Sequence, residues 1–153
     1  MKWRVLMVDD HVLFREAMVQ SLAADPDIEV VAQAADGLAA LQALSHIQPD
    51  VVCLDVNMPG QSGVEITRQL LALKPDVRVI GVSAHADPRV VAQMLHAGAM
   101  GDVTKLRVGQ ELPQAIRQVG TNQTYLSPEL DGRVAAEMLR LACDPWIPDR
   151  GRE

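Results

Sequence analysis

Short apolar runs, each ending in a charged or hydroxyl-bearing residue, alternate along this chain with stretches whose apolar residues recur at helical spacing. Such alternation indicates repeated βα units around a parallel sheet. The strands are expected at about residues 3–8, 29–34, 51–54, 77–82 and 101–104. A last helix at about 109–119 ends the array near Gly120. The sequence therefore predicts an α/β fold with a parallel sheet.

The residues that follow the apolar runs carry the chemistry: Asp9 and Asp10, Asp55, Ser83 and Lys105. The carboxyl ends of parallel strands lie side by side, at the edge where open α/β sheets bind their ligands. Three carboxylates crowded there are stable only if they are protonated, paired or metal-bound. Carboxylate and loop carbonyl oxygens suit Mg²⁺. A carboxylate beside Mg²⁺ and a lysine can attack a phosphoryl group and form an acyl phosphate, to which a hydroxyl can donate.

Composition narrows the classes of function. A chain of 153 residues suits one domain with a short appendage. A net charge of -6 argues against a nucleic-acid surface on this chain. Cys53 and Cys143 form neither a CxxC pair nor a disulfide framework, which favours a reducing compartment. With no signal peptide, and no apolar run near the roughly 20 residues that span a bilayer, a cytoplasmic protein with no membrane partner is expected.

Over about residues 3–120, four sequence words, in order and with matching spacing, resemble the receiver domain of bacterial two-component response regulators. The words are Val8-Asp9-Asp10-His11, Leu54-Asp55-Val56-Asn57-Met58-Pro59-Gly60, Val82-Ser83-Ala84, and Ala97-Gly98-Ala99 followed by Lys105. The resemblance implies a doubly wound, flavodoxin/CheY-like α/β fold with a five-stranded parallel sheet in the order 2-1-3-4-5 and an extra C-terminal helix. It implies a receiver domain over residues 1–121.

The same resemblance implies a role for each acidic residue. Asp55 is the phosphoacceptor. Asp10 and Asp55 hold Mg²⁺ directly together with the main-chain carbonyl of Asn57, and Asp9 acts through water. The phosphoryl donor is a phosphohistidine on a partner sensor histidine kinase. The protein is then a signalling switch, whose only catalysis is the uptake and loss of its own phosphoryl group.

By resemblance, Ser83 is the switch hydroxyl and Lys105 pairs with the phosphoryl group. One position departs from the family pattern. Three residues before Lys105 the family usually has Tyr or Phe, which turns inward when the switch hydroxyl engages the phosphoryl group, and here that residue is Asp102. A carboxylate is costly to bury in an apolar slot unless it is protonated or paired. Asp102 is therefore expected to form a salt bridge with Lys105 or to remain in solvent.

The segment after the βα array resembles the connector of the NarL/FixJ (LuxR-type) subfamily, which leads to a helix-turn-helix DNA-binding domain. Its words are Gly120 and then Tyr125-Leu126-Ser127-Pro128-Glu129. Residues 122–153 are thus expected to be a linker helix and tail toward an output domain missing from a truncated chain, with DNA bound only through that domain. The stripe of Leu130, Val134, Met138 and Leu141 is expected to pack against the domain, a homodimer surface being the other reading.

Two other functions stay open. A haloacid-dehalogenase-like phosphatase also uses an aspartyl nucleophile, Mg²⁺, a Ser or Thr and a Lys. Its nucleophile, however, follows the first strand and has a second Asp two residues on, where this chain has Asn57 after Asp55. A receiver-like adaptor that no longer signals by phosphate is favoured by Asp102 but not by the acidic cluster, because unused carboxylates would only cost stability. His85, two residues after Ser83, is a candidate to border the site.

Overall fold

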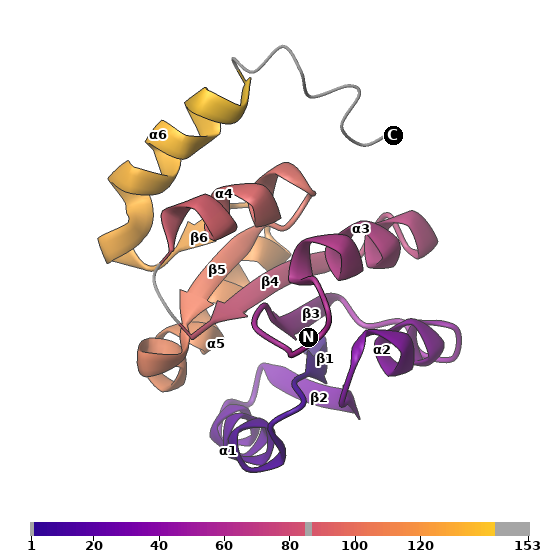
Figure 1. The fold of residues 1–153 in the computed structure, drawn as a ribbon. Coiled ribbons are helices and arrows are strands. Elements are labelled where there is room, and N and C mark those ends of the chain that lie inside the picture. The colour runs from indigo at the N-terminus through magenta and orange to yellow at the C-terminus, as the bar shows by residue number, and fades with distance from the viewer. Residues whose placement is uncertain (1, 85–86, 143–153) are drawn as a thin grey trace.

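The computed structural model describes residues 2–84 and 87–142. Its strands form one parallel sheet in the order β2-β1-β3-β4-β5-β6 (Figure 1). The strands are β1 (Trp3–Val8), β2 (Ile28–Ala34), β3 (Val51–Asp55), β4 (Arg78–Ser83), β5 (Gly101–Thr104) and β6 (Tyr125–Leu126). The predicted order 2-1-3-4-5 is confirmed, and the structure extends the predicted five strands by β6 at the edge beside β5.

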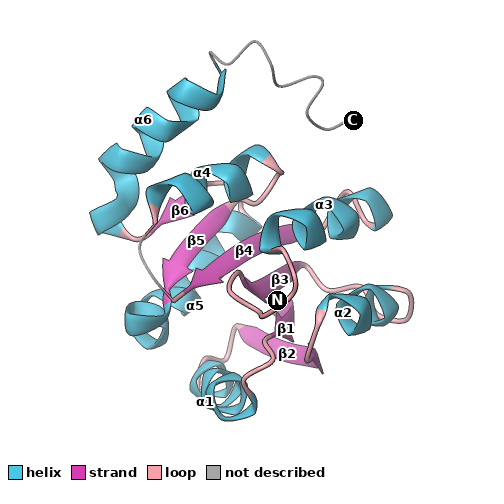
Figure 2. Cartoon of the chain, in the orientation of Figure 1, coloured by secondary structure: helices cyan, strands magenta, loops and turns pink. Residues whose placement is uncertain are grey.

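Helices cover both faces of the sheet, as the doubly wound prediction requires (Figure 2). They are α1 (Val12–Ala23), α2 (Gly37–Leu44), α3 (Gly63–Leu73), α4 (Pro88–His96), α5 (Val108–Gly120) and α6 (Asp131–Ala142). One core cluster joins the sheet to α1 and α5 through residues such as Leu22 and Ile116. A second joins the opposite face to α2, α3 and α4 through Leu44, Leu70 and Met94. Every residue of β3 is buried, because this central strand is covered on both sides.

Short polar residues fix where the helices begin. The Asp36 carboxylate accepts a hydrogen bond from the main-chain N–H of Ala39 at 2.7 Å and so caps α2. Asp87 caps α4 by accepting from the main-chain N–H of Arg89 at 3.0 Å, and Pro88 occupies the first turn. Because the strands are parallel, their carboxyl ends, and the loops that lead into the helices, lie together at one edge of the sheet. Among the described residues, no helix has the length and apolar character needed to cross a bilayer.

The added strand β6 ties the connector into the sheet. Tyr125 pairs with Gly101, and Leu126 pairs with Asp102. A Cβ atom on Gly101 would lie 2.8 Å from the Tyr125 carbonyl oxygen, so a glycine permits this close approach. Two residues are too short a run for a strand prediction, which is why the sequence indicated only five strands. The connector from Tyr125 to Leu126 is thus part of the sheet.

The final helix packs against α4. Buried Leu130 and Val134 form a third cluster with Val91 and Ala92 of α4, and Met138 and Leu141 lie at its border. This agrees with the predicted packing of the stripe against the domain. The predicted tail, and Cys143 with it, lies outside the described residues.

A buried carboxylate fastens the connector to α5. Glu111 is 7% exposed. It accepts hydrogen bonds from the hydroxyls of Ser127 at 2.8 Å and Tyr125 at 3.0 Å, and it pairs with the Arg107 guanidinium at 2.6 Å. The Ser127 oxygen in turn accepts from the main-chain N–H of Thr104 at 3.3 Å. A buried carboxylate satisfied in this way joins β5, α5 and the connector.

Replacing Glu111 by alanine is expected to loosen residues 125–142. The change leaves the buried Ser127 hydroxyl without its acceptor, which costs about 1–3 kcal/mol. Amide hydrogen exchange followed by mass spectrometry should show roughly 5- to 150-fold faster exchange in these residues, and little change in β1 and β3. Glu111→Gln is the matched control, since its amide oxygen still accepts from both hydroxyls. Equal exchange in the alanine variant and the parent protein would contradict this account.

Candidate functional site

Two adjacent strands place three carboxylates at one edge of the sheet. Asp9 and Asp10 follow β1, and Asp55 ends β3; the pairing of Val8 with Leu54 brings the two strand ends together. Asp9, Asp10 and Asp55 each offer an oxygen, and these oxygens lie within 4.8 Å of one another. Asp9 and Asp55 are buried, whereas Asp10 is exposed. The cluster is therefore open to solvent at Asp10.

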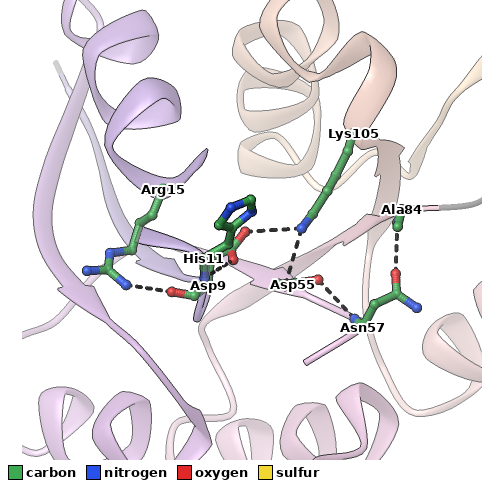
Figure 3. Close-up of polar contacts among 7 residues, drawn as sticks. All are labelled: Asp9, His11, Arg15, Asp55, Asn57, Ala84 and Lys105. Atoms are coloured by element: carbon green, nitrogen blue, oxygen red, sulfur yellow. Dashed lines mark hydrogen bonds and ion pairs between the residues drawn. The ribbon is translucent and has the colours of Figure 1, made fainter. Parts of the chain in front are cut away.

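A lysine from the other side of the site lies between the two buried carboxylates (Figure 3). The ammonium of Lys105, just after β5, is 3.5 Å from Asp9 Oδ2 and 3.4 Å from Asp55 Oδ2. It also lies 4.6 Å from the ring centroid of Phe14, a cation–π contact. One ammonium cannot neutralise three carboxylates, so the site carries excess negative charge and favours a further cation.

Asp9 is fixed by its own loop. Its Oδ1 accepts a hydrogen bond from the main-chain N–H of His11 at 2.8 Å, and its main-chain carbonyl accepts from Arg15 at 2.6 Å. Its Oδ2 is buried and accepts no hydrogen bond from any described residue, although the Lys105 ammonium is near. A buried carboxylate oxygen that accepts no hydrogen bond, beside two other carboxylates, fits a hard divalent cation such as Mg²⁺.

Asp55 is held in place from both sides. Its Oδ1 accepts from the main-chain N–H of Asn57 at 2.9 Å, and its Oδ2 faces Lys105. Burial raises the pKa of Asp55, and the neighbouring charge of Asp9 adds to that rise; the Asn57 amide and the Lys105 ammonium oppose it. A bound cation at this point would favour the ionised, nucleophilic form of Asp55.

Asn57 joins two loops of the site. Its side-chain oxygen accepts a hydrogen bond at 2.8 Å from the main-chain N–H of Ala84, which follows β4 (Figure 3). The loop after Asp55 is thereby tied to the loop after Ser83. The main-chain carbonyl of Asn57 lies in this same segment. His85, the predicted border residue, lies outside the described residues.

The prediction for Asp102 was wrong in both of its forms. Asp102 is 0% exposed, and among the described residues it has no ion pair with Lys105. Its Oδ1 accepts a hydrogen bond from the Ser83 hydroxyl at 2.8 Å. The register pairs Gly81 with Asp102, and a Cβ on Gly81 would lie 2.5 Å from Asp102 Oδ2. A glycine on β4 therefore leaves the space into which the carboxyl turns. Burial raises the pKa of Asp102 to about 8, while the Ser83 hydrogen bond acts in the opposite direction.

The structure thus brings together Asp9, Asp10, Asp55 and Lys105, but directs the Ser83 hydroxyl to Asp102. Two contributors escaped the sequence reasoning, namely Phe14 and Arg15 of α1. Their place in the sequence could have indicated both residues. The helix α1 begins two residues after Asp10, so its first turn borders the site.

Known proteins that resemble this chain are response regulators and transcriptional regulators. The family model described as the response regulator receiver domain matches residues 5–117. The transcriptional regulatory protein DegU of Brevibacillus brevis is 37% identical over 140 residues, which are 92% of this chain and 59% of DegU. The response regulator GacA of Pseudomonas viridiflava is 41% identical over 132 residues, 86% of this chain and 62% of GacA. The chain thus spans about three fifths of the length of these relatives.

A solved structure extends the likeness to the connector. The crystal structure of a LuxR-family two-component response regulator from Aurantimonas superposes with a TM-score of 0.82 at 30% sequence identity. The match covers 94% of this chain and 100% of that one. Since the matched family model ends at residue 117, this overlap reaches well past it.

Proposed function

Since this chain belongs to the response regulator receiver family, among its NarL/FixJ (LuxR-type) members, we propose that it is a switch that accepts a phosphoryl group on Asp55. The observation that carries the proposal is the position of Lys105, whose ammonium lies within 3.5 Å of the carboxylates of both Asp9 and Asp55. A nucleophilic carboxylate, an adjacent cation and a cluster suited to Mg²⁺ are the parts that phosphoryl transfer needs.

In this proposal a carboxylate oxygen of Asp55 forms the new bond to phosphorus. The phosphorus–nitrogen bond of a phosphohistidine breaks, and the electron pair stays with the imidazole of the donor, which takes up a proton. Lys105 pairs with the transferred group, and Asn57 keeps the carboxylate oriented through its main-chain N–H. The donor class is a sensor histidine kinase.

Asp10 and Asp55 would hold Mg²⁺ with the main-chain carbonyl of Asn57, and Asp9 would act through water. The support is the closeness of the oxygens of the three carboxylates and the buried Oδ2 of Asp9, which accepts no hydrogen bond from a described residue. When bound, Mg²⁺ supplies positive charge that offsets the charge on the phosphoryl oxygens. The proposed role of Ser83 is to donate its hydroxyl hydrogen to one of those oxygens once its bond to Asp102 is released.

Family membership argues against the phosphatase alternative, because the relatives are named as response regulators or transcriptional regulators. The phosphate-independent adaptor keeps one specific observation in its favour, the engagement of Ser83 by the buried Asp102. A folded protein that binds Mg²⁺ but takes up no phosphoryl group would support that adaptor.

The output is proposed from the relatives. We propose that residues 1–121 form the receiver and that residues 122–153 connect it to a helix-turn-helix domain through which transcription is controlled. Two observations support this proposal: the relatives are named as regulators, and they are longer than this chain. A homodimer is also proposed. Its surface would have to lie elsewhere than the apolar stripe of α6, because that stripe packs against α4.

The test is the intact mass after incubation with acetyl phosphate. Mg²⁺ should permit the gain of one phosphoryl group, and EDTA should prevent it. Asp10→Asn should raise the Mg²⁺ concentration needed for half-maximal uptake by about 10-fold or more, since a direct carboxylate ligand is lost. Asp36→Asn, at the α2 cap, is the control and should leave that concentration unchanged. Equal phosphoryl uptake in the presence of Mg²⁺ and of EDTA would contradict the proposed metal dependence.

A further inference from the structure

Asp102 makes hydrogen bonds in two directions. Its side chain accepts from the Ser83 hydroxyl at 2.8 Å, and its main-chain carbonyl accepts from the main-chain N–H of Ser127 at 3.2 Å. Ser83 ends β4 at the edge of the phosphorylation site, whereas Ser127 belongs to the connector. A single residue of β5 therefore touches both the site and the segment that leaves the domain.

The surroundings of the Asp102 carboxyl are apolar. Its Oδ2 occupies the space beside Gly81, where a Cβ would also meet Val56 and Met94 at 3.0 and 3.1 Å. That Oδ2 accepts no hydrogen bond from any described residue. Ser83 is thus the side-chain partner that compensates the burial of Asp102, and losing it would leave a buried carboxyl unsatisfied.

Ser83 has one hydroxyl hydrogen to donate. In the structure that hydrogen is directed to Asp102, so it is not available to a phosphoryl group on Asp55 at the same time. We propose that Asp102 is a positioning residue that retains the Ser83 hydroxyl in the resting protein and competes for it with the phosphoryl group. This inference rests on the proposed function, and it replaces the aromatic readout of the family by a hydrogen bond exchanged between two acceptors.

The exchange has a direct route to the connector. When the phosphoryl group takes the hydroxyl, the Asp102 carboxyl loses its partner while it is still buried. The strand that carries it pairs with β6, and its main-chain carbonyl holds Ser127. A change in the contacts of Asp102 therefore acts on the first residues of the connector.

Binding of beryllium fluoride with Mg²⁺, a phosphoryl mimic, measures the competition. Asp102→Val removes the acceptor with a side chain that suits a buried strand, and should tighten beryllium fluoride binding by about two- to tenfold, the scale of one net hydrogen bond. Asp102→Asn keeps an oxygen for Ser83 and should stay within about twofold of the parent protein. In a Ser83→Ala background, Asp102→Val should have no effect on binding.

Two results of these binding measurements would overturn the inference. One is unchanged affinity in Asp102→Val. The other is an equal gain in the Ser83→Ala background, because the effect would then come from packing rather than from the hydroxyl. If the parent protein neither binds beryllium fluoride nor takes up phosphate, the proposed function itself fails, and the competition fails with it.

A measurement without metal or phosphate separates these failures. The Asp102 carboxyl can be titrated by its carbon-13 chemical shift in the parent protein and in Ser83→Ala. The Ser83 hydrogen bond lowers the pKa of Asp102. Its loss in Ser83→Ala should therefore move the titration of Asp102 to higher pH. An unmoved titration would show that the Ser83–Asp102 bond does not form in solution, and would overturn the inference whatever the site binds.

Discussion

Replacing Asp55 by asparagine is expected to abolish the Mg²⁺-dependent uptake of a phosphoryl group from acetyl phosphate. An amide lacks the anionic oxygen that forms the bond to phosphorus, and the initial rate should fall on the order of a thousandfold or more, as when an enzyme loses its nucleophile. Intact mass over time measures the loss. Asp76→Asn, at an exposed position, is the matched control and should take up phosphate at the parent rate.

The fold should survive this substitution. Asparagine has nearly the same shape, and its side-chain oxygen can still accept from the main-chain N–H of Asn57, as Asp55 Oδ1 does at 2.9 Å. The change also removes one of three crowded carboxylates, which relieves repulsion with Asp9. Circular dichroism and thermal unfolding should therefore match or exceed those of the parent. Undiminished uptake by a folded Asp55→Asn protein would refute the assignment of the phosphoacceptor.

The second large effect is expected in the pH dependence of stability, through Asp102. Burial raises the pKa of this carboxyl from 3.8 to about 8 in the folded protein. Between these values the folded chain keeps a proton that the unfolded chain has released. The stability tied to this proton is complete below pH 3.8, declines as the pH rises, and is lost above about pH 8. The free energy of unfolding should fall by about 1.4 kcal/mol per pH unit in this window.

Asp102→Asn cannot titrate, so its stability should lack this decline. Relative to the parent, the variant should gain about 4 kcal/mol in its free energy of unfolding between pH 5 and pH 8, as measured by urea unfolding. Both proteins contain Asp55, whose pKa is also raised, and its contribution cancels in the difference. Equal pH profiles for the two proteins would contradict the assignment of a buried, protonated Asp102.

The convergence of Asp9, Asp55 and Lys105 could be predicted because each follows an apolar run, and the geometry of parallel strands decides the rest. The buried position of Asp102 was harder to predict from the sequence. Alternation along β5 places it on the face opposite buried Val103, but only the register with Gly81 shows that there is room to bury it. The partners of Glu111 depend on how the connector returns to the sheet, which no local pattern encodes.

Pairing of β6 with β5 has a practical consequence for building chimaeric regulators. Hydrogen bonds from the main-chain N–H groups of Tyr125 and Ser127 reach the carbonyls of Met100 and Asp102, at 3.0 and 3.2 Å. A splice at residue 121 would replace these donors, and with them the outermost strand, by foreign sequence. A junction after Ala142 would carry β6 and the α6–α4 contact into the hybrid intact. Exchange of output modules should therefore be attempted at that later junction.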